Sequence, residues 1–64
     1  MSDLFVGDTI AISYIHIFAR IWNIVKVVSI DKNFIEIEYE NHLIEKFKLN
    51  DFPDFLLVKR SKTA

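Results

Sequence analysis

Residues 35–49 read IEIEYENHLIEKFKL, and this stretch decides the fold. Glutamates alternate with large apolar residues in its first half, and lysines take over the alternation after a short break. An alternation with period two is typical of a β-strand that has one buried and one exposed face. The stretch therefore predicts two antiparallel strands joined by a short loop, with the charges on the solvent side of a small β structure.

The charges also predict how these two strands pair. A two-residue loop would oppose Glu38 to Glu45, which places like charges side by side. A three-residue loop, 41–43, opposes glutamates to lysines instead, and each such cross-strand pair contributes about 0.2–1 kcal/mol. This register gives the pairs Glu36–Lys48, Glu38–Lys46, Ile35–Leu49 and Ile37–Phe47. It also turns Glu45 inward, beside Tyr39.

Further strands are expected on both sides of this hairpin. Residues 7–8, Gly-Asp, open the first strand with a turn, and residues 31–33 are typical of another turn. Asn50 or Asp51 is expected to cap one short helical turn, with Pro53 just inside it. The expected strands cover residues 9–14, 22–30, 34–40, 44–49 and 55–59. We therefore predict an all-β fold, a small five-stranded SH3-like barrel with a short helical turn before the last strand.

The size of the chain limits what can stabilise it. With 64 residues it forms one domain, with an expected core at 6–58 and a basic tail at 59–64. A domain of this size buries only about 60% of its unfolded surface. The absence of cysteine and the presence of only two histidines predict no disulfide, no metal site and no cofactor. A dense apolar core, a partner, or both remain as sources of stability, and the hydrophobic fraction of 52% lies at the upper edge of the usual range.

Catalysis, secretion and membrane insertion are not expected. No serine has a histidine and an acid at the spacing of a known catalytic motif, so we predict that the chain is not an enzyme and has no small-molecule substrate. Residues 10–30 have the length of a membrane span, but Arg20 would lie near its middle at a cost of about 2.5–3.5 kcal/mol. Without cysteine and without a signal-like N-terminus, the chain is expected to be cytoplasmic.

Several short motifs resemble the Tudor-like branch of SH3-like barrels. They are Gly7-Asp8 before the first strand, Trp22 at the start of the second, Ser29-Ile30-Asp31 at its end, Glu38-Tyr39-Glu40-Asn41 at the end of the third, and Leu49-Asn50-Asp51-Phe52 before the last. The resemblance covers residues 6–58. The chain departs from the family pattern at Glu40, where glycine is usual, and in its apolar first loop, 14–21, where reader modules are polar.

The resemblance implies one specific ligand site. Tudor modules that read methylated Lys or Arg hold the cation in an aromatic cage, where the ring faces contribute up to about 2 kcal/mol. At the matching positions this chain has Tyr14, Trp22 and Tyr39, with Asn41 as the polar partner. The alternative interpretation is that the same three rings pack the barrel, with their polar tips at its rim.

A protein-interaction surface is the function that the composition favours most. The apolar residues at 15–22, together with the phenylalanines elsewhere, exceed what a barrel of this size can bury, and exposed apolar patches mark partner surfaces. The predicted contact residues are Tyr14, Ile17, Phe18, Arg20, Trp22 and Tyr39. The expected partner is another protein or a second copy of the chain. The richness in Ile, Lys, Asn and Phe suggests an accessory protein of a phage or mobile element.

Three alternatives stay open. A small barrel can bind nucleic acid with aromatic rings beside basic residues, here Arg20, Lys26, Lys59, Arg60 and Lys62. The net charge of −1 weighs against this function. An acidic third strand would mimic nucleic acid, but Lys46 and Lys48 interrupt its single-sign field. The third alternative is that the chain is a subunit or accessory piece of a larger assembly, in which the apolar face is permanently covered.

Overall fold

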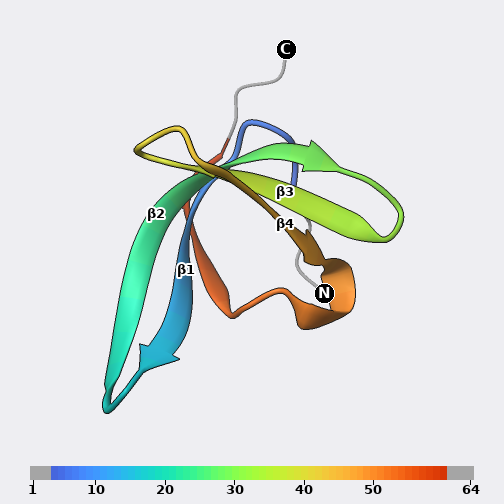
Figure 1. Cartoon of the computed structure of the whole chain (residues 1–64). Coiled ribbons are helices and arrows are strands. Elements are labelled where there is room, and N and C mark those ends of the chain that lie inside the picture. Colours follow the sequence, from blue (N-terminus) through green and yellow to red (C-terminus); the bar gives the residue numbers. More distant parts are fainter. Residues whose placement is uncertain (1–3, 61–64) are drawn as a thin grey trace.

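Five antiparallel strands form one sheet in the computed structural model, which describes residues 4–60 (Figure 1). The elements, in chain order, are β1 Thr9–His16, β2 Ala19–Ile30, β3 Phe34–Tyr39, β4 Ile44–Lys48, the 3-10 helix η1 Leu49–Asp51 and β5 Phe55–Lys59. The strands lie side by side in the order β4-β3-β2-β1-β5. The prediction of an all-β, five-stranded chain with a short helical turn before the last strand is confirmed.

The core consists of apolar side chains on one face of the sheet. They come in pairs from β1, β2 and β3, and each is at most 2% exposed: Ile10, Ile12, Val25, Val27, Ile35 and Ile37. Within each pair the spacing is two residues, which places both side chains on the same side of a strand. Burying one such side chain contributes about 1.5–3 kcal/mol. Three strands therefore carry the core, and Phe47 of β4 and Phe55 of β5 pack against its margin.

Aromatic rings connect the two outer strands of the sheet. Phe52, which follows η1, makes edge-on contacts with Phe47 of β4 and Phe55 of β5, at ring-centroid distances of 5.4 and 5.7 Å. Such edge-to-face contacts are a preferred geometry of aromatic pairs. The segment around η1 therefore joins β4 to β5 and covers the margin of the core between them.

A buried carboxylate ties the turn before β1 to the residue after β5. Asp8 is fully buried, and its Oδ2 accepts a hydrogen bond from the Phe5 amide at 3.0 Å. Arg60 places its Nε 3.5 Å from the same oxygen and its guanidinium 5.0 Å from the centre of the Phe5 ring. A buried charge is stable only when it is paired and hydrogen-bonded. The predicted turn at residues 7–8 is confirmed, with Gly7 at a φ of 97°, and Asp8 is a structural residue within it.

The β3–β4 hairpin keeps the predicted faces but not the predicted register. Its loop is 40–42 rather than 41–43, because the Tyr39 amide donates to the Leu43 carbonyl oxygen at 2.8 Å. The observed pairs are Phe34–Lys48, Ile35–Phe47, Glu36–Lys46, Ile37–Glu45 and Glu38–Ile44. The predicted pairs are therefore wrong. The register differs by two residues, an even number, so every side chain stays on its predicted face.

Loop chemistry explains this shift. A three-residue hairpin loop typically combines a type I turn with one residue at positive φ. His42 takes that position with a φ of 70°, and histidine is among the residues enriched there. The Asn41 side-chain oxygen accepts a hydrogen bond from the Leu43 amide at 3.1 Å, and the His42 amide donates to the Tyr39 carbonyl oxygen at 2.8 Å. The favourable backbone conformation of the loop at 40–42 therefore stabilises the hairpin more than the second glutamate–lysine pair of the predicted register would.

The first hairpin is longer than predicted. The strand expected to end at residue 14 continues to His16, and the strand expected to begin at residue 22 begins at Ala19. The predicted first loop, 14–21, is therefore wrong, since these residues form two strands around a two-residue turn at 17–18. Apolar residues on both faces of this segment hide the alternation that would reveal a strand.

The short helix also differs from its prediction. η1 begins after Lys48, which has no side-chain cap hydrogen bond, so the expected cap at Asn50 or Asp51 is wrong. Pro53 follows the helix rather than lying inside its first turn. A single 3-10 turn with few backbone groups to satisfy needs no side-chain cap.

Candidate functional site

One hairpin extends beyond the rest of the sheet (Figure 1). β5 pairs with β1 only as far as Ile12, and β3 pairs with β2 only from Val25 onward. Residues 13–24, which we call the arm, therefore continue as a two-stranded ribbon, without a third strand on either side among the described residues. With a rise of about 3.3 Å per residue, the ribbon extends roughly 15 Å beyond its last neighbours.

The arm carries large apolar side chains that are exposed to solvent. Phe18 at its tip is 100% exposed, Ile17 is 74% exposed and Ile15 is 69% exposed. The further exposed apolar residues of the arm are Tyr14, Trp22 and Ile24. They lie on both faces of the ribbon, because successive residues of a strand point to opposite sides. A concentration of exposed apolar side chains is typical of a contact surface.

The turn at the tip of the arm contains residues that do not favour turns. Ile17 is held at a φ of 58°, and it is the first of the two turn residues between the paired His16 and Ala19. A positive φ at this position is typical of a type II′ turn, where glycine dominates. For a residue with a side chain, such a sparsely populated backbone conformation costs about 1–3 kcal/mol. The chain therefore has an exposed isoleucine where glycine would give a more stable turn.

Arg20 is the one Lys, Arg, Asp or Glu residue of the arm. Its guanidinium donates to the Ser13 hydroxyl and lies 4.0 Å from the Asp54 carboxylate, in the segment before β5. The two side chains of this ion pair are 49% and 88% exposed, so the pair contributes little to stability. Its position nevertheless connects the ribbon to the body of the sheet and leaves the tip at 17–18 without a formal charge.

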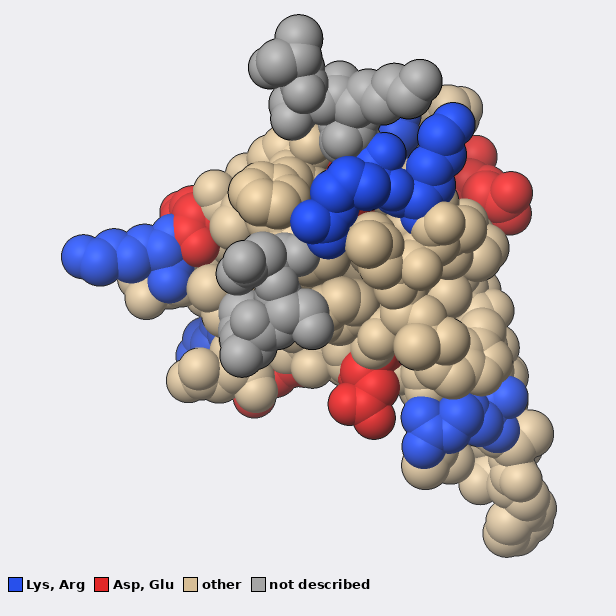
Figure 2. Space-filling view, turned by 180° about the vertical axis from the view of Figure 1, so that it is seen from behind, with Lys and Arg blue, Asp and Glu red and all other residues tan. Residues whose placement is uncertain are grey.

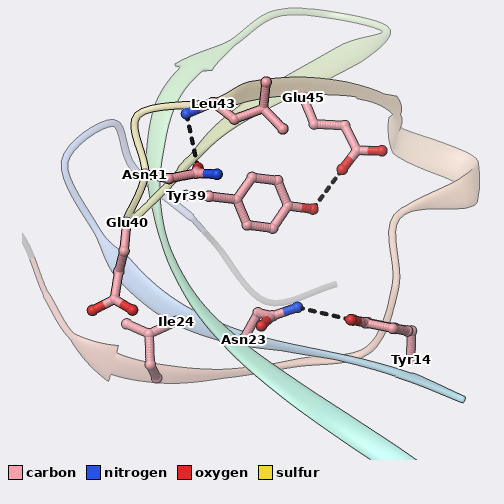
Figure 3. Close-up of a pocket in the computed structure, with 8 residues that line it drawn as sticks. All are labelled: Tyr14, Asn23, Ile24, Tyr39, Glu40, Asn41, Leu43 and Glu45. Atoms are coloured by element: carbon pink, nitrogen blue, oxygen red, sulfur yellow. Dashed lines mark hydrogen bonds between the residues drawn. The ribbon is translucent and has the colours of Figure 1, made fainter. Parts of the chain in front are cut away.

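A second feature lies where the arm meets the β3–β4 loop, in a hollow with two tyrosines in its wall (Figure 3). The hollow has a volume of about 480 Å³ and is lined by Tyr14, Asn23, Ile24, Tyr39, Glu40, Asn41, Leu43 and Glu45. The Tyr39 hydroxyl donates to Glu45 Oε1 at 2.5 Å, and Asn23 Nδ2 donates to the Tyr14 hydroxyl at 3.2 Å. Both phenols are therefore engaged by hydrogen bonds within the wall.

The structure brings together part of the predicted aromatic cage. Tyr14, Tyr39 and Asn41 line the same hollow, whereas Trp22 is not among its lining residues. Trp22 pairs with Ser13, which comes one position before Tyr14, so the Trp22 and Tyr14 side chains leave opposite faces of the ribbon. The hollow thus has two of the three predicted rings.

Tyr39 and Glu45 make the shortest side-chain contact of the hollow. The predicted inward orientation of Glu45 beside Tyr39 is confirmed by their hydrogen bond. Partial burial raises the pKa of Tyr39 to about 12, with further contributions from the hydrogen bond to Glu45 and from its negative charge. The phenol therefore keeps its proton at neutral pH, where it acts as a donor to the carboxylate.

Some residues of these two features are not among the predicted contacts. Ile24 belongs to the exposed apolar set of the arm, and Asn23 lines the hollow. The signal that identifies them is the pairing of β1 with β2, in which Ile24 opposes Ala11 and Asn23 opposes Ile12. Because the predicted hairpin is shorter than the observed one, this pairing does not follow from the sequence.

The predicted basic residues do not form one patch. Lys26 and Lys59 lie on either side of β1. Arg20 precedes Lys26 by six residues on the same strand, about 20 Å away, and Arg60 is engaged with the buried carboxylate described above. Lys62 lies outside the described residues. Figure 2 accordingly shows the Lys and Arg atoms of this face in separate groups.

Neither a metal centre nor a membrane-spanning helix is found in the part of the chain that the structure describes. Residues 4–60 contain no group of three His, Cys, Asp or Glu side chains suited to hold a metal ion. None of the helices in this range has the length and apolarity to cross a membrane.

No protein-family model, curated protein or solved structure matches the chain. A functional proposal therefore depends on the arm and the hollow.

Proposed function

We propose that this chain is a small non-enzymatic protein-interaction module, an SH3-like barrel of the Tudor-like type, whose arm contacts a protein partner. The observation that carries the proposal is the tip of the arm, where a fully exposed Phe18 follows an isoleucine at positive φ. Backbone strain of this kind concentrates at functional sites. The strand order and the helical turn before β5 support the barrel part of the proposal.

The contact surface consists of the six predicted residues together with Ile15, which belongs to the predicted apolar stretch 15–22 and is exposed. The six residues are Tyr14, Ile17, Phe18, Arg20, Trp22 and Tyr39. Aromatic and arginine side chains are the typical anchors of protein interfaces. The tip supplies apolar area, and the base of the arm supplies the hollow with its tyrosines and Glu45. A partner that covers both would contact the tip and the Tyr14 face of the ribbon, whereas Ile15 and Trp22 lie on its other face.

A capture experiment with a matched pair of variants tests this proposal. The tagged chain is incubated with cell lysate, after nuclease treatment and at high salt, beside Phe18→Asp and the control Val6→Asp. Val6 is 52% exposed and lies in the turn before β1, at the end of the strand away from the arm. We expect a discrete protein band with the wild type and with Val6→Asp, and its loss with Phe18→Asp. Both variants should unfold at the same temperature as the wild type, because both positions are exposed.

Equal capture by all three proteins would overturn the proposal, since the tip of the arm would then make no contact. Capture that is lost equally with both variants would do the same, because it would point to a general effect of added negative charge.

A nucleic-acid surface is the second candidate, and the position of two lysines favours it. Lys26 of β2 and Lys59 of β5 both lie opposite Thr9 of β1, and Lys59 is the first residue of the basic tail at 59–64. Binding at such a surface weakens steeply with salt, because phosphate counterions are released. The same capture experiment, repeated without nuclease and at low salt, distinguishes this function: a nucleic-acid catch would appear only under those conditions and would be unaffected by Phe18→Asp.

A further inference from the structure

The arm has an open backbone edge along β2. Ser13 and Trp22 oppose each other in the ladder, and the Ser13 amide donates outward, to the Asp54 carbonyl oxygen at 2.9 Å. In an antiparallel ladder, opposed residues either exchange hydrogen bonds or both point outward. The N–H and C=O of Trp22 therefore point away from β1. Since β3 pairs with β2 only from Val25 onward, this part of the edge can accept a further strand.

The two outer strands of the sheet have protective features that this edge lacks. β4 carries Glu45, Lys46 and Lys48 within five residues. β5 is also short, has an irregular register with β1, and ends at Lys59. Charges, short strands and irregular registers are the means by which proteins prevent strands from pairing edge to edge. The arm's β2 edge, residues 19–24, has one charge and a regular register with β1.

We propose that the arm pairs with the arm of a second copy, β2 edge to β2 edge, in a four-stranded antiparallel sheet across a two-fold axis. This inference rests on the proposed function, because it names the partner of the same surface. An isolated two-stranded ribbon is marginally stable in water, and further strands stabilise it. A two-fold axis lets one strand sequence supply both sides of the ladder, since the same patch serves on each copy.

Among the possible registers of the two β2 edges, the one with the two-fold axis at Ile21 gives the most favourable side-chain pairs. Outward-pointing residues must oppose each other, so Arg20, Trp22 and Ile24 pair within their own set. Centring the pair on Arg20 opposes two like charges, which is destabilising. Centring it on Ile21 opposes Arg20 to Trp22 twice, with each cation beside an indole ring, and pairs residues 19–23 of the two edges. Centring it on Trp22 pairs residues 20–24 and opposes Arg20 to Ile24, so the cation has no aromatic ring opposite it.

This register predicts that Ile21 faces its own counterpart across the axis. The two residues form a non-hydrogen-bonded pair, in which the Cα atoms are about 4.5 Å apart. That separation is within the range of a disulfide. Because the chain has no cysteine, Ile21→Cys introduces a single thiol into each copy.

Oxidative cross-linking of single-cysteine variants is the first test. We expect Ile21→Cys to form a disulfide-linked dimer roughly tenfold faster than Trp22→Cys, which opposes Arg20, and than the surface control Val6→Cys. Equal rates for the three variants would overturn the pairing. Faster cross-linking of Trp22→Cys than of Ile21→Cys would overturn the proposed register.

A second test changes the backbone edge and leaves every side chain in place. A chain of 64 residues can be made by chemical synthesis with one methylated amide, either at Trp22 or, as the matched control, at Lys46. The Lys46 amide also points outward, because the Leu49 amide, three positions on, donates inward to the Asn33 carbonyl oxygen at 2.9 Å. Sedimentation equilibrium should give a dimer dissociation constant at least about tenfold higher for the Trp22 form than for the unmodified chain. A Lys46 form that weakens the dimer equally would overturn the proposal.

The proposed function and the self-pairing fail in different ways. If the purified wild type is a monomer at every concentration while Phe18→Asp still abolishes capture from lysate, the self-pairing is wrong and the interaction module stands. If neither a dimer nor arm-dependent capture is found, both proposals are wrong.

Discussion

Two hairpins each place a non-glycine residue at positive φ: His42 in the β3–β4 loop, with a φ of 70°, and Ile17 at the tip of the arm, with a φ of 58°. Histidine is enriched at such positions, and the loop around it is supported by the hydrogen bond from the Leu43 amide to Asn41. A β-branched residue at positive φ is an outlier. The turn chemistry is therefore favourable in one hairpin and unfavourable in the other.

The same two hairpins differ in what they expose. Outward positions of the β3–β4 hairpin carry charges, such as Glu36 opposite Lys46, and Lys46 also lies 4.5 Å from the centre of the Phe34 ring. The tip of the arm carries Ile17 and Phe18 instead. The β3–β4 hairpin therefore combines favourable turn chemistry with a charged surface, whereas the arm combines unfavourable turn chemistry with an apolar surface, as the proposed contact function requires. The predictions below test this division.

The largest expected contrast is between an isoleucine of the body and one of the arm. Ile37 is fully buried and Ile15 is 69% exposed. Ile37→Ala should lower the free energy of unfolding by about 2–5 kcal/mol, because it removes buried area and leaves a cavity. Ile15→Ala should change it by no more than about 0.5 kcal/mol. Urea unfolding measures both values, and a comparable loss for Ile15→Ala would show that the arm is part of the folding core.

The next contrast is between the two residues at positive φ. Ile17→Gly should raise the free energy of unfolding by about 1 kcal/mol, since relief of the strain exceeds the added entropy of the unfolded chain. His42→Gly should gain less, about 0.5 kcal/mol, because histidine tolerates this conformation and its ring lies 3.2 Å from Glu38. The same urea experiment applies, and a less stable Ile17→Gly would remove the evidence for strain at the tip.

The third contrast is confined to high pH and concerns the hollow between the two hairpins. The pKa of Tyr39 is about 12 in the folded chain, above its ordinary value of 10.0, so the folded state holds this proton more tightly than the unfolded state. The stability that results is fully present below pH 10 and is lost as the pH rises through about 12. Urea unfolding across this range should show a shallower decline for Tyr39→Phe than for the wild type. An unchanged decline would show that folding does not raise the pKa of Tyr39.

Much of the body of the fold follows from the sequence. Alternation identifies the inward residues Ile10 and Ile12 of β1 and Ile35 and Ile37 of β3, because a strand with one buried face leaves a period of two. The same parity places Glu45 inward beside Tyr39, and an even-numbered shift of register leaves that placement intact.

The arm does not follow from the sequence, for a physical reason. Turn rules place glycine or asparagine at a two-residue hairpin turn, and this chain has Ile17 and Phe18 there. Without a turn signal, neither the length of the hairpin nor the pairing of Trp22 with Ser13 can be derived, and this pairing determines that Trp22 points away from the hollow. The features that hide the arm from sequence rules are the ones that make it a candidate functional site.

The most direct test of the account is one variant measured in two ways. Ile17→Gly keeps the hairpin, removes the strain and removes one exposed apolar side chain from the tip. We predict that it unfolds at a higher urea concentration than the wild type and captures less of the partner at equal concentration. A variant that is more stable and captures the partner as well as the wild type would contradict the central claim, because the isoleucine at the tip would then serve no contact.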